Sequence, residues 1–183
     1  MKKLVLLIAT GFLFLSCEKE IVQSPNNEGQ NINLAKGTAN ISSNGNTQIS
    51  GLGFYAVSPE CEPLVTGAAA ALRLTGDLEG CLYVFIDEFD CSPSGTYREV
   101  GREYFVGTYK GETGTFRTTY RFEAKYQGCA EDGAPLGLEI FGRCQHPLVD
   151  GSGTGVFEGV TGRVDFKDDI DAGNFPYRGH LKF

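Results

Sequence analysis

Three side chains that could polarise a carbonyl group or move a proton lie close together in the sequence: Glu139, Arg143 and His146. Residues separated by an even number share one face of an extended strand, so we expect Glu139 and Arg143 to lie on the same face. Inside a barrel this pair would polarise a carbonyl group or move a proton. On the outer face it would form a cross-strand charge ladder, which is the favoured interpretation. The catalytic residues are therefore unknown, with Glu139 and Arg143 as weak candidates.

Six cysteines form the second group of reactive side chains, at positions 17, 61, 81, 91, 129 and 144. Disulfides form readily outside the cytoplasm. Without Cys17, which is discussed below, an odd number remains, so one thiol stays unpaired or pairs with another chain.

Strand direction suggests which cysteines pair. We expect the strands near 81–90, 98–109, 115–126 and 136–146 to alternate in direction. Cys81 and Cys144 then lie at one end of the sheet, and Cys91, Cys129 and Cys61 lie at the other. We therefore predict a disulfide between Cys81 and Cys144, and a second one between Cys91 and either Cys129 or Cys61. A link from Cys81 to Cys61 or Cys91 would argue against this strand order.

Metal and cofactor motifs are absent from the sequence. There is no Cys-x-x-Cys pair, and His146 is the only imidazole near the cysteines, which argues against zinc. The acidic segment 165–171 lacks the ordered spacing of an EF-hand loop, although its carboxylates would suit Ca²⁺. No nucleophile elbow, phosphate loop or dinucleotide fingerprint occurs. We expect neither a metal nor a cofactor.

The amino terminus indicates export. Two lysines precede the apolar run 4–15, which is too short to span a membrane as a helix, since that needs roughly 20 residues. The following sequence, Phe-Leu-Ser-Cys, resembles the lipobox of bacterial lipoproteins. That resemblance implies cleavage of a signal peptide, residues 1–16, and acylation of Cys17, with palmitate as one such chain. The alternative is an ordinary secretory signal with an incidental cysteine.

The residues after Cys17 predict a tethered domain at the outer membrane. Segment 18–20 lacks the aspartate that usually retains lipoproteins at the inner membrane, and it resembles acidic tags that direct lipoproteins to the cell surface. Segment 21–37 is rich in Asn, Gln, Ser and Gly and cannot bury enough apolar area to fold, so 17–37 reads as a flexible tether. We expect one domain over 38–183, with its core at about 66–183.

Composition restricts the class of protein. The chain has 183 residues, 41% hydrophobic and 21% charged, which suits one folded domain. A formal charge of −7 argues against nucleic acid as a partner, because phosphates attract clustered Lys and Arg. The chain has 25 glycines, 21 Phe and Tyr residues, one methionine and no tryptophan. This composition favours a β-sheet protein with many turns.

Hydrophobic alternation predicts the strands. Residues 116–126 alternate aromatic or small side chains with charged and polar ones, as a half-buried antiparallel strand does, and the tail 175–183 repeats this pattern. Segment 81–89 is apolar on both faces, so we expect it to be covered on both sides. About seven such strands after residue 66, without a helical period, indicate a closed barrel or a sandwich.

The segment 151–164, GSGTGVFEGVTGRV, favours the barrel. It resembles the Gly-rich turn and Phe-x-Gly-x-x-Gly entry of a late strand in the allene oxide cyclase and dirigent superfamily, and the ending 176–183 is similar too. The resemblance covers about 66–183 and implies an antiparallel closed barrel of about eight strands around a small apolar cavity. Segment 70–84 shows no counterpart of the acidic, Asn- and Pro-containing catalytic segment, so no functional residue carries over.

These observations predict an outer-membrane lipoprotein whose barrel binds a small apolar ligand or a partner protein without catalysis. The membrane is reached through the lipid anchor, and an oligomer is compatible with the sequence. The expected ligand-lining residues are Tyr83, Phe85, Phe116, Tyr120 and Phe122. The alternative is an isomerase or cyclase acting on an unsaturated small molecule inside the barrel. A cavity with two or more converging polar groups would distinguish this alternative.

Overall fold

A computed structural model describes residues 45–183, which form an all-β structure. The predicted signal peptide 1–16, the lipidation site Cys17 and the tether 17–37 lie outside the described residues. No helix within residues 45–183 is long and apolar enough to cross a membrane. The strands are β1 (Asn46–Tyr55), β2 (Ala70–Gly76), β3 (Leu78–Cys91), β4 (Thr96–Tyr109), β5 (Glu112–Cys129), β6 (Pro135–Pro147), β7 (Thr154–Gly155), β8 (Thr161–Lys167) and β9 (Phe175–Lys182).

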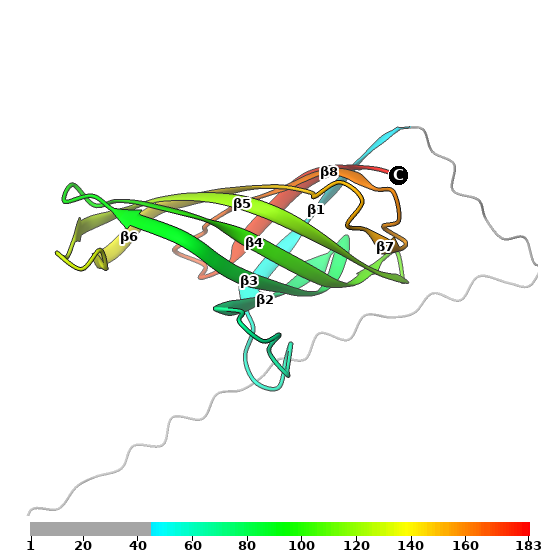
Figure 1. The fold of residues 1–183 in the computed structure, drawn as a ribbon, viewed down its shortest axis with the longest axis horizontal. Coiled ribbons are helices and arrows are strands. Elements are labelled where there is room, and N and C mark those ends of the chain that lie inside the picture. The colour runs from blue at the N-terminus through cyan, green and yellow to red at the C-terminus, as the bar shows by residue number, and fades with distance from the viewer. Residues whose placement is uncertain (1–44) are drawn as a thin grey trace, which may run out of the picture. The chain divides into compact units, whose positions relative to one another are not determined.

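Eight of these strands close into an antiparallel barrel, as predicted (Figure 1). Each of β1 to β5 pairs with the next strand, β6 pairs with β8, β8 with β9, and β9 with β1. The two-residue strand β7 pairs with β5 outside this cycle. Closure leaves no free sheet edge among the eight strands. It requires β1, which precedes the core expected at about 66–183.

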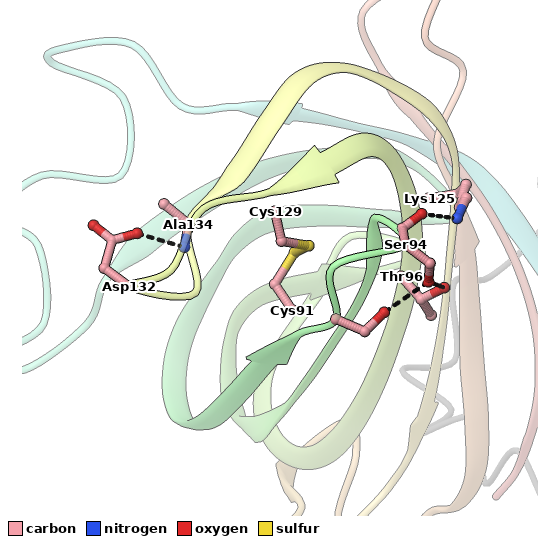
Figure 2. The surroundings of a disulfide bond; sticks show 8 residues. Cys91, Ser94, Thr96, Lys125, Cys129, Asp132 and Ala134 are labelled. Carbon is pink, nitrogen blue, oxygen red and sulfur yellow. Dashed lines mark hydrogen bonds between the residues drawn. A yellow bond between two sulfur atoms is a disulfide. The ribbon is translucent and has the colours of Figure 1, made fainter.

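Strands β3 to β6 are longer than the others and extend the wall at one end of the barrel (Figure 1). The disulfide between Cys91 and Cys129 joins the last residue of β3 to the last residue of β5, across the start of β4 (Figure 2). It therefore ties the two hairpin tips together at this end. Of the two partners predicted for Cys91, the structure selects Cys129.

The opposite end of the barrel is filled by aromatic side chains. Phe105 and Phe116 face each other across β4 and β5 with ring centroids 4.8 Å apart. Phe157, from the segment between β7 and β8, packs edge-on against Phe116 at 5.0 Å and is fully buried. The segment 151–164, from which a barrel was predicted, thus contributes Phe157 to the packed core at this end. Its Gly162 has a φ of +133°, and a Cβ there would lie 2.1 Å from the carbonyl oxygen of His180.

The predicted disulfide between Cys81 and Cys144 is wrong. Cys81 pairs with Cys61 at a Cα separation of 5.6 Å, whereas Cys144 is a buried free thiol. Cys81 points outward under the segment 56–69, while its neighbour Leu82 points into the barrel core. Both faces of β3 are apolar because this segment covers the outer one. The apolar pattern therefore could not show which face lies inside.

Strand order is not affected by this pairing. A link between Cys81 and Cys61 was expected to contradict an up-and-down arrangement, yet β1 to β6 follow that arrangement. The incorrect assumption concerned the face of β3 and not its direction. Cys61 reaches Cys81 from the segment outside the barrel, where the hydroxyl of Tyr83 also donates a hydrogen bond to the carbonyl oxygen of Cys61.

Candidate ligand-binding site

A cavity of about 290 Å³ lies inside the barrel toward the end with the extended strands. Its position follows from the register, because Glu99 and Phe122 face each other there, several residues along β4 and β5 from the packed pair Phe105 and Phe116. Apolar side chains, among them residues of β2, β3, β5, β8 and β9, supply most of the wall. They include Leu72, Val84, Ile86, Phe122, Phe166 and Phe175.

The first polar group in the wall is centred on Glu99. The hydroxyl of Tyr97 donates a hydrogen bond to its Oε2 at 2.5 Å, and that of Tyr120 donates to its Oε1 at 2.6 Å. Burial, and then the hydrogen bond to Glu99, raises the pKa of both tyrosine hydroxyls above their usual value. Both phenols therefore stay protonated as donors to this carboxylate at neutral pH.

A second polar group lies deeper and is almost completely buried. Glu103 accepts hydrogen bonds at Oε2 from the hydroxyl of Thr118 at 2.6 Å and from Nδ1 of His146 at 2.5 Å. The exposed fractions of Glu103 and His146 are 3% and 4%. The imidazole packs between the rings of Tyr120 and Phe166. Its Nε2 has no hydrogen-bond partner among the described residues.

The third group is a carboxyl pair, Glu139 and Asp168. One oxygen of each lies within 2.4 Å of the place where a Cβ on Gly142 would be, so the pair occupies space that only a glycine leaves open. Tyr126 donates a hydrogen bond to Oε2 of Glu139 at 3.3 Å. Burial, followed by the hydrogen bond and the negative charge of Glu139, raises the pKa of Asp168 to about 7. The negative charge of Glu139 thus favours the protonated form of Asp168 near neutral pH.

Two of the five expected lining residues, Tyr120 and Phe122, line the cavity. Phe116 faces inward but belongs to the packed end of the barrel. The expectation for Tyr83 and Phe85 is wrong, because these side chains lie on the outer face of β3, on the same side as Cys81. Tyr83 is buried there under the segment 56–69, and Phe85 lies beside the guanidinium group of Arg102.

Glu139 and Arg143 lie on opposite faces, contrary to the prediction. The pairing of β5 with β6 shifts between Lys125 and Tyr126, where one step along β5 spans two residues of β6. This bulge reverses the alternation. Glu139 therefore points inward with Asp168, whereas Arg143 points outward and forms a salt bridge with Glu123 at 3.1 Å. His146, which lies beyond the bulge, faces the interior.

Sequence reasoning missed Glu99 and Glu103, and it considered Asp168 only as part of an acidic loop suited to Ca²⁺. A signal for the first two was present in β4, where they share the alternation of the inward-facing Gly101 and Phe105. A charged residue on the apolar side of a strand requires a partner when it is buried, so it marks a functional or structural site. Asp168 follows β8 directly and gave no such signal.

The raised pKa of Asp168 predicts a pH-dependent difference in stability. The unfolded carboxyl titrates near 3.8 and the folded one near 7, so the folded state binds more protons between these values and loses stability as the pH rises through this range. The full shift would correspond to about 4 kcal/mol, which solvent screening at this partly open site reduces to about 1–2 kcal/mol. Asp168→Asn should remove this loss while keeping a donor for Glu139.

The measurement is urea unfolding at pH 4.5 and pH 8. The free energy of unfolding of the wild type should fall by about 1–2 kcal/mol relative to Asp168→Asn over this interval. Asp171→Asn, in the exposed turn that follows, is the control and should show the wild-type dependence. An identical pH dependence in wild type and Asp168→Asn would contradict the raised pKa of Asp168.

Within residues 45–183, no three His, Cys, Asp or Glu side chains are grouped so that they could hold a metal ion. Comparison with known proteins found no matching family model, no matching curated protein and no matching solved structure. The site must therefore be interpreted from its own geometry.

Proposed function

We propose that the barrel binds a small molecule with a largely apolar body in the cavity described above. The observation that carries this proposal is a cavity of about 290 Å³ whose aromatic and aliphatic walls are interrupted by a few polar groups. Small-molecule sites have this composition, and their volumes begin near 300 Å³. Nε2 of His146 indicates that the ligand also carries a polar end, because an entirely apolar molecule would leave this buried atom without a partner.

The closed eight-stranded barrel is compatible with the resemblance to the allene oxide cyclase and dirigent superfamily. That resemblance supports an interior ligand, but it assigns no activity, since one fold hosts many functions. It rests on the segment 151–164, which forms β7, the buried residue Phe157 and the start of β8. Membership in this superfamily remains a part of the proposal.

The test of ligand binding is native mass spectrometry of the protein purified from its own membranes. We expect a non-covalent small molecule on the wild type. Val84→Phe and Ile86→Phe, which place a larger side chain at the cavity wall, should lose it. Val106→Phe adds the same bulk at an exposed position and should retain it. A wild type without bound molecule that also fails to bind a library of small apolar compounds would overturn the proposal.

We also propose that the barrel is held at the outer membrane by lipid on Cys17. The apolar run 4–15, the lipobox-like sequence and the polar segment 21–37 support this location. Radiolabelled palmitate should enter the full-length protein and should not enter Cys17→Ala. Equal incorporation in the two proteins would exclude the anchor.

A second candidate function is acid–base isomerisation of an unsaturated small molecule. It is favoured by the convergence of polar groups in the cavity and specifically by Asp168, whose pKa near 7 suits a general acid or base. Binding is common to both functions, so turnover distinguishes them. If the co-purified molecule is a substrate, the wild type should convert it and Asp168→Asn should bind it without conversion. Retention of full turnover in Asp168→Asn would exclude this role.

A further inference from the structure

The cavity is rich in carboxyl groups, which accept hydrogen bonds and carry negative charge when ionised. Glu99, Glu103 and Asp168 line the cavity, and Glu139 adjoins it through Asp168. The lining contains no lysine and no arginine. The nearby guanidinium groups of Arg98 and Arg143 lie outside the barrel, where both form salt bridges with Glu123. No fixed positive charge of the described wall therefore balances these carboxylates.

Three tyrosine donors in the wall are already used by the protein. The hydroxyl hydrogens of Tyr97 and Tyr120 go to Glu99, and that of Tyr126 goes to Glu139. Because each phenol has a single hydrogen, these tyrosines can offer a ligand only oxygen lone pairs and ring faces. The faces of aromatic rings attract cations.

His146 gives an independent indication of the missing partner. A carboxylate oxygen only accepts, so Nδ1 of His146 carries the hydrogen that lies between it and Glu103. Nε2, on the other side of the ring, is buried and lacks a partner among the described residues. Buried polar atoms are usually paired, so this atom calls for a polar group of a bound molecule.

We propose, on the basis of the ligand-binding function above, that the ligand is an organic cation: a small amine with an apolar, preferably aromatic, body. Its ammonium group would donate hydrogen bonds to acceptors of the wall and offset the charge of buried carboxylates, while its apolar part packs against the phenylalanine and tyrosine rings. Anionic ligands are disfavoured, because the carboxylates of the wall repel a further negative charge.

The test compares three probes that share a phenyl ring and a two-carbon chain but differ in the charge of the head group: 2-phenylethylamine, 2-phenylethanol and 3-phenylpropanoate. Calorimetric titration of the full-length protein at pH 8 should show the ammonium binding at least about tenfold more tightly than the alcohol, as charge-assisted hydrogen bonds and cation–π contacts predict. The carboxylate should bind least.

Glu99→Gln locates the effect. This variant keeps the shape of the side chain and an acceptor for one of the two tyrosine hydroxyls, but it removes the charge. The preference for the amine over the alcohol should fall severalfold, with the affinity for the alcohol little changed. Glu123→Gln removes a carboxylate from the outer face and should leave the preference intact. Asp168→Asn is the second variant, to be used if Glu99→Gln fails to fold.

The outcomes separate this inference from the proposed function. If the alcohol binds in the cavity as tightly as the amine, or the preference survives both Glu99→Gln and Asp168→Asn, the cation is excluded and small-molecule binding stands. If none of the three probes binds, the cation inference is overturned. The proposed function is then decided by the co-purified molecule, whose own charge state gives a further check.

Discussion

Replacing Phe157 by alanine should lower the free energy of unfolding by about 3–5 kcal/mol. The side chain is fully buried and packs against the rings of Phe105, Phe116 and Tyr109. It enters from a segment outside the eight barrel strands, and the surrounding strands are held by their hydrogen-bond ladders, so the resulting cavity cannot collapse easily. Urea unfolding followed by far-ultraviolet circular dichroism measures the loss.

Val149→Ala is the matched control for this substitution. Val149 belongs to the same connection between β6 and β8, and 39% of it is exposed. Its backbone hydrogen bond to Arg117 is unaffected by shortening the side chain. We expect a change within about 0.5 kcal/mol, as for other surface positions. A loss at Phe157 no larger than that at Val149 would show that Phe157 does not close the barrel.

The β-barrel could be predicted from the sequence, because each of its strands carries the same alternation of apolar and polar side chains. Each barrel strand must present apolar side chains on alternate positions to the interior, and residues 116–126 show this alternation clearly, with the buried Phe116 and Tyr120 on one face. Absence of a helical period removed the folds in which helices cover a sheet. The segment 46–55 was harder to assign, because only Ile49 and Gly53 of β1 are buried and four of its ten residues are Asn, Thr, Gln or Ser.

The residues of the cavity were harder to predict from the sequence, because their positions depend on departures from that alternation. On β3 both faces are apolar, so Tyr83 and Cys81 were placed inside when they lie outside. On β6 a bulge separates Glu139 from Arg143 and moves only the first into the barrel. Partners such as Glu103 and His146 are 43 residues apart, and their 2.5 Å contact follows from three-dimensional pairing of strands that no local pattern reports.

The second large effect concerns the two disulfides. Replacing Cys91 and Cys129 together by alanine should lower the free energy of unfolding by about 4 kcal/mol in the loop-entropy model. The corresponding loss for Cys61 and Cys81 should be about 3 kcal/mol. The difference arises because the first bridge closes a loop of 38 residues in the unfolded chain and the second a loop of 20. Urea unfolding of both double variants measures the two losses, after peptide mapping under non-reducing conditions has verified the pairing.

Amide hydrogen exchange tests a local effect of the disulfide on the native state, which the entropy of the unfolded chain does not influence. The bridge from Cys91 to Cys129 fastens the hairpin tips beside the cavity, so its removal should increase exchange at residues 90–96 and 129–135 before the rest of the barrel opens. Cys144→Ala breaks no disulfide and should leave exchange at both tips unchanged. Because the barrel wall is continuous through β4 and β5, protection around Phe105 should persist in every variant. Uniform loss of protection would instead show that the bridge holds the whole barrel and not its extended end.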